Sequence, residues 1–196
     1  MVLCTGNICR SPMVEALLAG ELRRRGVEAT VHSAGLLFDG RAADPHSVSA
    51  MADRELDLSG FASRKMTESL LRSADLVIGM ERRHVREAAV ALPEVWPRAF
   101  TLKELARRAS AAGPRPDDVP VEDWLARLAA DRTTTDHLGD DPSDDVPDPI
   151  GRSLRTFRRC AEDLERLVGV VVEHLWPASP STDAVPSNDA VRSTTA

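Results

Sequence analysis

The stretch that decides the fold is "MVLCTGNICRSP", residues 1–12. Its first three residues are hydrophobic and predict a short strand. Ser11 and Pro12 are residue types that begin helices, so a helix is expected to start near them. The free N–H groups and the dipole at a helix N-terminus favour an anion. The loop between strand and helix therefore predicts an anion-binding site.

The loop residues suggest what that site does. Gly6 is expected to take a positive φ, which would let successive N–H groups point inward around an anion. Arg10 adds a planar cation that matches phosphate oxygens. Cys4 lies at the bottom of this electropositive cup, where a thiolate nucleophile is favoured. The spacing alone is weak, because Cys4 and Cys9 could also be zinc ligands, a disulfide or inert residues in a turn.

The composition narrows these alternatives. The chain has 196 residues, a net charge of −6 and three cysteines. An acidic chain is a poor partner for nucleic acid, and three cysteines are too few for a disulfide scaffold. No convincing Cys/His pair elsewhere completes a zinc site, so no metal is expected. There is no apolar run of about 18 residues and no signal peptide, so a cytoplasmic protein without a membrane span is expected.

The hydrophobic pattern alternates between strand and helix. Strands are predicted over 27–35, 74–80 and 98–102, and helices over 12–26, 45–56, 81–92 and 150–176. The continuous apolar run "ADLVIGM", 74–80, is typical of a strand buried on both faces. Alternating strands and helices predict an α/β fold, a three-layer sandwich with a four-stranded parallel sheet.

Residues 103–147 interrupt this rhythm. Two helices are predicted, over 102–110 and 121–131, and eleven acidic residues stand against three arginines between Arg115 and Asp148. The segment is expected to be an acidic, partly helical insertion, either solvent-facing surface or a lid over the site. Residues 177–196 are rich in Ser, Pro, Asp and Thr and are predicted to be a disordered tail, which leaves 1–176 as one domain.

Several segments carry a resemblance to a known family. "VLCTGNICRSPMVE" (2–15) is similar to the signature of the low-molecular-weight protein tyrosine phosphatases. "HSAGLLFDGRAADPHSVSAMADRELDLSGFASRKMT" (32–67) resembles the second strand, active-site wall and second helix of that family, and "VPDPIG" (146–151) resembles its Asp-Pro loop. The similarity covers roughly residues 1–102 and 145–176. It implies hydrolysis of phosphotyrosine, an aryl phosphomonoester, through a phosphocysteine intermediate, without a cofactor.

The resemblance also implies a role for each matching residue. Cys4 would be the nucleophile, Arg10 would bind the phosphoryl oxygens, and Asp148 would be the general acid and then the base. Backbone amides would complete the phosphate cradle, Asn7 would brace it, Ser33 would hold Asn7 and Ser11 would hydrogen-bond the thiolate. The expected substrate-binding residues are Thr5, Gly6, Asn7, Ile8, Cys9, Ser11, Ser33 and Phe38.

Some of these roles have competitors. Asp141, Asp144 and Asp145 lie close to Asp148, which is preferred because Pro149 follows it and Gly151 comes shortly after. Phe38 is either a ring that stacks on the substrate or an ordinary packing residue.

Three further positions bear on specificity and regulation. Ile8 favours phosphotyrosine, because phosphoarginine phosphatases of the family have Thr there. Cys9 is either a thiol that can trap Cys4 as a reversible disulfide or a small buried residue. Phe61 stands where some members have a histidine that supports the loop, so this support must come from elsewhere.

Two other functions use the same loop. A thiol-coupled arsenate reductase needs two further cysteines near the third strand, and "ADLVIGMERRHVREAAVAL" (74–92) has none. A non-catalytic phosphate or phosphopeptide binder would not need the set Cys4, Arg10 and Asp148. The expected partner is a tyrosine-phosphorylated protein, with bacterial tyrosine kinases as candidates by resemblance. The oligomeric state is left open.

Overall fold

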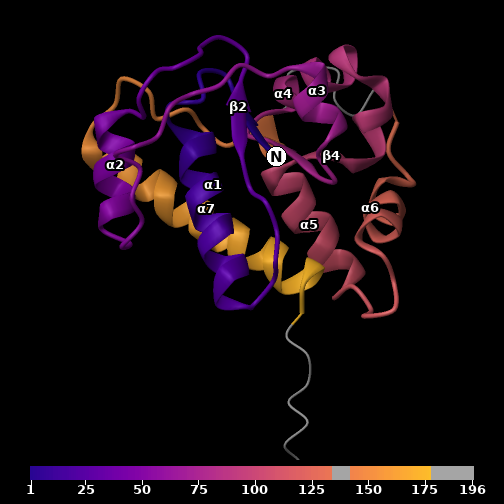
Figure 1. Ribbon diagram of the computed structural model, residues 1–196. Helices are drawn as coiled ribbons and strands as arrows, with labels where there is room; N and C mark the ends of the chain where they lie inside the picture. The colour runs from indigo at the N-terminus through magenta and orange to yellow at the C-terminus, as the bar shows by residue number, and fades with distance from the viewer. Residues whose placement is uncertain (134–141, 178–196) are drawn as a thin grey trace, which may run out of the picture.

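The computed structural model describes residues 1–133 and 142–177 (Figure 1). Its centre is a four-stranded parallel sheet in the order β2-β1-β3-β4, which confirms the predicted fold class. Each strand has three residues: β1 (Val2–Cys4), β2 (Ser33–Gly35), β3 (Val77–Gly79) and β4 (Ala99–Thr101). The strand predicted over 27–35 is thus limited to its last three residues.

The helices connect these strands and extend the fold. They are α1 (Arg10–Arg24), α2 (Pro45–Ala52), α3 (Glu68–Arg72), α4 (Arg82–Ala91), α5 (Leu102–Ala112), α6 (Val121–Ala129) and α7 (Leu154–Leu175), with 3₁₀ helices η1 (Pro93–Arg98) and η3 (Pro142–Asp144). The sequence predicted all of these except α3, η1 and η3. Pro93, at the first position of η1, ends α4 because proline cannot continue the helical hydrogen bonding.

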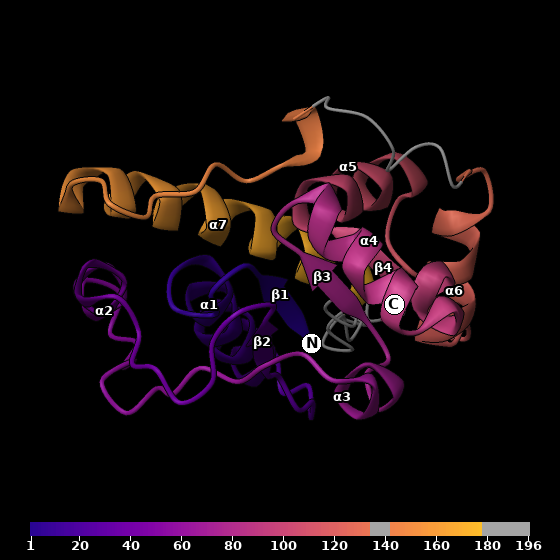
Figure 2. The same cartoon turned by 90° about the horizontal axis from the view of Figure 1, so that it is seen from above.

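The sheet is covered on both faces, as the alternation of side chains along β1 shows. Val2 and Cys4 join one hydrophobic cluster with α1, α2, α5, α6 and α7, whereas Leu3 joins a second cluster with α3, α4 and η1. Successive side chains of a strand point to opposite faces, so the two clusters are the two interfaces of a three-layer sandwich. Figure 2 shows α1 and α2 on one side of the strands and α3 and α4 on the other.

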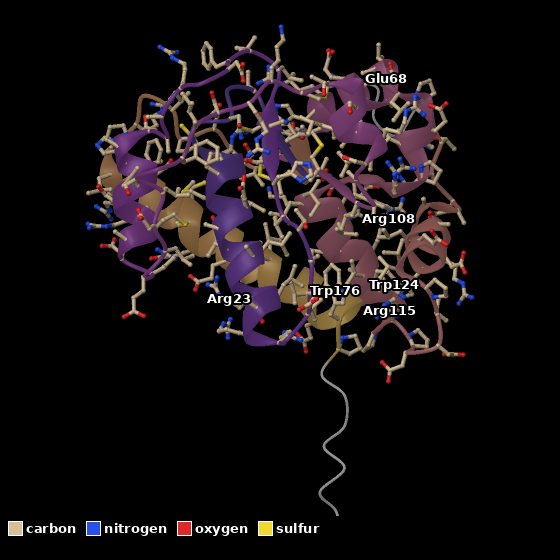
Figure 3. All side chains as sticks on the ribbon, in the orientation of Figure 1. Arg23, Glu68, Arg108, Arg115, Trp124 and Trp176 are labelled. Carbon is tan, nitrogen blue, oxygen red and sulfur yellow. The ribbon has the colours of Figure 1, made fainter. Side chains whose placement is uncertain are left out.

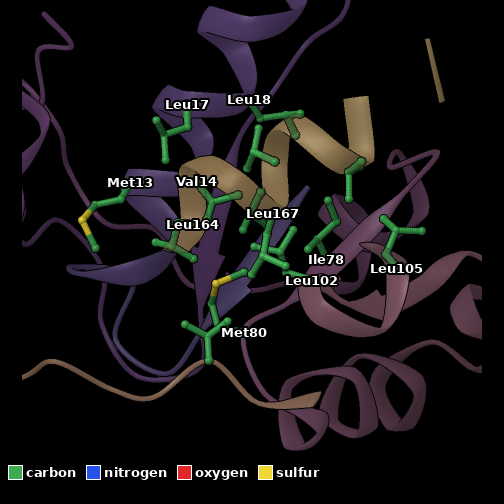
Figure 4. Close-up of a cluster of buried hydrophobic side chains, with 14 of the residues drawn as sticks. Met13, Val14, Leu17, Leu18, Ile78, Met80, Leu102, Leu105, Leu164 and Leu167 are labelled. Carbon is green, nitrogen blue, oxygen red and sulfur yellow. The ribbon is translucent and has the colours of Figure 1, made fainter. Parts of the chain in front are cut away.

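The larger cluster fixes the position of the first helix relative to the last. α7 packs on α1 and α5, and aliphatic side chains from all three helices meet those of β3 (Figure 4). Met13 and Val14 are fully buried one turn after the start of α1. Burying a side chain of this size stabilises the fold by about 1.5–3 kcal/mol. The start of α1, and with it the loop after β1, is therefore anchored by the core.

The segment 103–147 contributes to this core. Trp124, Leu125 and Leu128 of α6 are buried, as are Leu105 and Ala109 of α5. The expectation of a solvent-facing insertion does not describe these helices, because an apolar stripe at helical spacing faces inward and Glu104 of α5 is buried with it.

The far end of this segment is tied to α7. Arg115 donates from its Nε atom to the carbonyl of Leu175 at 2.7 Å. Figure 3 shows Arg115 and Trp124 near Trp176, at the end of α7.

Two expectations concern the remaining chain. The predicted disordered tail, 177–196, lies outside the described residues except for Pro177. Among the helices of the described residues, none is long and apolar enough to cross a membrane.

Candidate active site

The loop after β1 is shaped by Asn7 rather than by Gly6. Asn7 has a φ of 51°, and Gly6 is not among the positive-φ residues, so the conformation predicted for Gly6 is wrong. The Asn7 side chain compensates the strain of this left-handed conformation with three hydrogen bonds. Its Nδ2 atom donates to Ser33 Oγ at 2.7 Å and to Ser11 Oγ at 2.9 Å, and its Oδ1 atom accepts from the Arg64 N–H at 2.8 Å.

Glycine is needed here for close approach. A Cβ atom on Gly35 would lie 2.8 Å from the Asn7 backbone nitrogen, closer than real contacts allow. A Cβ atom on Gly6 would lie 3.2 Å from the ring of Phe38. Gly35 therefore lets the loop rest on β2, and Gly6 lets Phe38 rest on the loop.

Cys4 lies at the end of β1 and receives hydrogen bonds at its sulfur. The Asn7 N–H donates to Cys4 Sγ at 3.2 Å, and Ser11 Oγ lies 2.9 Å from it. Ser11 Oγ accepts from the Asn7 amide and keeps its own proton available for the sulfur. Both contacts offer hydrogen-bond donors to the sulfur.

The same network continues behind the loop. Ser33, which accepts from Asn7, donates to Glu15 Oε2 at 2.5 Å. Glu15 comes from α1, so this bond closes a connection between helix, loop and β2. With Arg64, it supplies the support that was expected to come from a residue other than Phe61.

Arg10 is fully buried and points into the same cup. Its Nη1 atom donates to Glu81 and, at 2.7 Å, to the carbonyl of Val146, and its Nη2 atom donates to Asp148 Oδ2 at 2.7 Å. The buried Nε atom has no hydrogen-bond partner among the described residues. A buried donor without an acceptor is costly. An anion at this place would satisfy it.

Asp148 is the carboxylate of its segment that reaches this arginine. Its Oδ1 atom accepts from the Ile150 N–H at 3.1 Å. Asp145 instead accepts from the Arg82 N–H, and Asp144 pairs with Arg107. Asp141 lies outside the described residues.

These residues surround a cavity of about 190 Å³. Its lining consists of Cys4, Thr5, Gly6, Ile8, Cys9, Arg10, Leu37, Phe38, Asp148 and Ile150. Leu37 and Ile150 are large apolar residues that remain exposed, and the Arg41 guanidinium lies over the Phe38 ring at 4.4 Å from its centroid. The described part of 103–147 supplies none of the lining, so it does not act there as the lid that was considered.

Other expected residues have their own positions. Ser33 and Asn7 are buried, and neither is among the residues that line the cavity. Burial and the nearby Asp44 raise the pKa of Cys9 to about 12, and burial raises that of Cys160 to about 11, so both are held as thiols. Among the described residues, no group of His, Cys, Asp or Glu is placed to hold a metal ion.

The sequence reasoning missed Glu81 and His84. Burial raises the pKa of Glu81, but the charge and hydrogen bond of Arg10 outweigh this and hold it below its usual value. Burial lowers the pKa of His84 to about 3, so the ring is neutral. A signal was present in "GMERRH", 79–84, because β3 is the neighbour of β1 and the loops after adjacent parallel strands lie together.

A cysteine and a buried arginine at the carboxyl end of a parallel sheet surround a cup that can hold a phosphoryl anion. Comparison with known proteins gives the family. The family model described as "Low molecular weight phosphotyrosine protein phosphatase" matches residues 1–116. The chain belongs to this family and is a phosphatase.

Its relatives differ in their named substrates. The protein-arginine-phosphatase of Bacillus subtilis is 30% identical over 174 residues, which cover 88% of this chain and 93% of that one. The low molecular weight protein-tyrosine-phosphatase Wzb of Escherichia coli is 41% identical over 96 residues, 48% of this chain and 63% of that one.

Solved structures agree on the fold. The low molecular weight protein tyrosine phosphatase of T. tengcongensis has a TM-score of 0.67 at 27% identity, covering 89% of this chain and 97% of that one. A mutant of YwlE from Bacillus subtilis has a TM-score of 0.65 at 29% identity, covering 88% of this chain and 94% of that one.

Proposed function

We propose that this phosphatase hydrolyses phosphotyrosine in proteins through a phosphocysteine intermediate. The observation that carries the proposal is the apolar part of the cavity wall, where Leu37, Phe38 and Ile150 line the same cavity as Cys4. An aromatic ring gains free energy by burying apolar surface between such side chains.

The same cavity is a poor place for phosphoarginine. A guanidinium leaving group carries several N–H donors that need acceptors. Among the residues that the structure describes, Asp148 is the one carboxylate in the lining, and it already accepts from Arg10. Ile8, also in the lining, offers no acceptor. These features favour the aryl ester over the substrate named for the Bacillus relative.

The proposed reaction has two steps. The Cys4 thiolate attacks phosphorus, the bond from phosphorus to the tyrosine oxygen breaks, and Asp148 gives its proton to that oxygen. Water then attacks the phosphocysteine, Asp148 takes its proton, the P–S bond breaks and phosphate leaves. Arg10 and the loop N–H groups stabilise the charge on the phosphoryl oxygens in both steps.

The substrate protein is proposed only by class. A tyrosine-phosphorylated protein would present its side chain to the exposed Leu37 and Ile150. Bacterial tyrosine kinases are candidates, and the Cys4→Ser variant, used to trap phosphorylated proteins from cells, would identify the partner.

The test compares two phosphopeptides that differ only in the modified residue. Wild type is expected to release phosphate from the phosphotyrosine peptide and from p-nitrophenyl phosphate, with little release from phosphoarginine. Cys4→Ser should be inactive, and Cys160→Ser, on α7, serves as the matched cysteine control. A preference of the wild type for the phosphoarginine peptide, with no further change in Ile8→Thr, would overturn the substrate assignment.

The rival chemistry has its own readout. Arsenate-dependent oxidation of thioredoxin would indicate a reductase. Cys4 and Cys9 are buried in the site, Cys160 belongs to α7, and the chain over 74–92 supplies no cysteine, so no such oxidation is expected.

A further inference from the structure

His84 connects the first turn of α4 to the loop that holds the candidate nucleophile. Its ring is completely buried, and its Nδ1 atom accepts a hydrogen bond from the Glu81 N–H at 2.9 Å. Its other nitrogen, Nε2, lies 3.1 Å from Thr5 Oγ1. Thr5, which follows Cys4 in the loop after β1, is thus held by a side chain from the connection between β3 and β4.

The hydrogen bond from the Glu81 N–H determines which ring nitrogen of His84 carries the proton. A backbone N–H can only donate, so Nδ1 must be without a proton. Burial lowers the pKa of His84 to about 3, which leaves the ring neutral near pH 7. A neutral ring without a proton on Nδ1 carries it on Nε2, and His84 therefore donates to the Thr5 hydroxyl.

The Thr5 hydroxyl receives a second donor. Nη2 of Arg83, whose Nε atom is paired with Glu81 Oε2 at 2.6 Å, also donates to Thr5 Oγ1. A hydroxyl has two acceptor lone pairs and one proton. With two donors on the oxygen, the remaining capacity of Thr5 is to donate, and Thr5 lines the cavity.

The backbone of Thr5 fixes a second side of the cavity. Its carbonyl accepts from the N–H groups of Leu36 at 2.9 Å and Leu37 at 3.1 Å. Movement of Thr5 would thus displace the loop and the apolar wall together.

We propose that His84, as the Nε2–H tautomer, is a positioning residue that directs the Thr5 hydroxyl into the cavity as a donor to the bound phosphoryl group. This rests on the proposed function for the identity of the ligand, a phosphoryl dianion. It adds a side-chain donor to a cradle otherwise made of backbone amides and Arg10, and it gives the buried histidine a task in binding.

The test measures the affinity for inorganic phosphate, which needs no leaving group. Thr5→Val keeps the shape and removes the hydroxyl, and it is expected to weaken phosphate binding roughly tenfold, as for loss of one hydrogen bond to a charged group. Thr5→Ser should recover most of this loss. His84→Phe should weaken binding to a similar extent, and His84→Gln, which can both accept and donate, should weaken it less.

A double-variant cycle separates positioning from general stabilisation. If His84 acts through Thr5, the loss in Thr5→Val/His84→Phe is no greater than in either single variant. Glu87→Gln, an exposed change on α4, is the control and should bind phosphate as wild type does. Additive losses, or unchanged phosphate affinity in Thr5→Val, would overturn the proposal.

The tautomer is tested without any variant. The ¹⁵N chemical shifts of the His84 ring should show a protonated Nε2 and an unprotonated Nδ1 between pH 5 and pH 8. The opposite tautomer or a charged ring at pH 6 would refute the proposal. Because these readouts use phosphate or the free enzyme, a wild type that prefers phosphoarginine would overturn the proposed function and leave this inference standing.

Discussion

Two buried arginines, Arg10 and Arg132, hold their charges in different ways. Arg10 binds Glu81, Asp148 and a carbonyl, yet its Nε atom is without a partner in the described residues and it lines the cavity. The Arg132 guanidinium lies over Trp96 at 4.2 Å and over Phe100 at 4.5 Å from the ring centroids. Its Nε atom is 3.1 Å from Glu104 of α5.

The difference separates a charge kept for a ligand from a charge kept for the fold. Aromatic rings enclose Arg132, so it joins α5 to β4 and η1 and has no access to a substrate. Arg10 has polar partners on one side and an open cup on the other. Replacing each should therefore affect a different property of the enzyme.

The largest effect is expected for Arg10→Lys. Lysine keeps the charge but lacks the planar fork that matches phosphoryl oxygens. We expect kcat/KM for p-nitrophenyl phosphate to fall by about 10²- to 10³-fold, as for loss of a preorganised donor. The melting temperature should change little. A large loss of stability with nearly normal turnover would show that Arg10, like Arg132, serves the stability of the fold rather than the reaction.

Arg132→Met should show the reverse. Removing one partner of a buried ion pair leaves Glu104 with less compensation, although Arg108 still pairs with it at 3.0 Å. We expect the free energy of unfolding to fall by about 3 kcal/mol. Denaturant titration measures this loss, and kcat/KM at a temperature where the variant is folded should stay near the wild-type value. A loss of turnover in the folded variant would contradict the separation.

The sequence predicted the region around Arg10 better than the region around Arg132. In "MVLCTGNICRSP" the reactive side chains, the helix start and the strand are local, so their pattern indicates the cup. The error at Gly6 arose because the left-handed residue is chosen by tertiary contacts. Asn7 accepts that conformation only because Ser33 and Arg64, far along the chain, bind its side chain.

The region of α5 and α6 was harder to interpret because its burial is non-local. The acidic composition predicted a solvent-facing segment, whereas Trp124 and Leu125 form a narrow face that is buried in the core. The pairing of Glu104 with Arg132 depends on how α6 returns to η1, which no spacing in the sequence shows. Glu81 and His84 were missed for a related reason, since their roles come from the neighbouring position of β3 and β1.

The pH dependence of stability should separate the two regions by its sign. The pKa of His84 is about 3 in the folded protein and 6.5 in the ordinary state, so the unfolded chain binds an extra proton between these values. Its contribution to stability is lost as the pH falls from 6.5 toward 3, by up to about 1.4 kcal/mol per pH unit. Burial raises the pKa of Glu104 above its ordinary 4.5 despite Arg132 and Arg108. The stability that Glu104 contributes is therefore present at low pH and is lost as the pH rises above 4.5.

Glutamine variants measure the two contributions. Relative to wild type, His84→Gln should lose less stability on acidification below pH 6.5. Glu104→Gln should lose less stability as the pH rises above 4.5. Melting temperatures across this range provide the comparison, and variants whose curves run parallel to wild type would show that neither group controls it.

The smallest effect is expected for Gly6→Ala, which tests the cavity itself. Gly6 has no positive φ, so alanine brings no backbone strain, and its Cβ atom would meet the Phe38 ring at 3.2 Å. A ring at a cavity wall can shift by a few tenths of an ångström. We expect KM for an aryl phosphate to rise a few-fold, below about 1 kcal/mol, with kcat nearly unchanged.

Gly35→Ala is the matched variant for this test. Its Cβ atom would meet the Asn7 backbone nitrogen at 2.8 Å, and a backbone held by three side-chain hydrogen bonds cannot shift as a ring does. It should therefore lower kcat and phosphate affinity more than Gly6→Ala. If Gly6→Ala proved the more damaging change, the loop would depend on freedom at Gly6 during turnover, and the shape set by Asn7 would not be its active form.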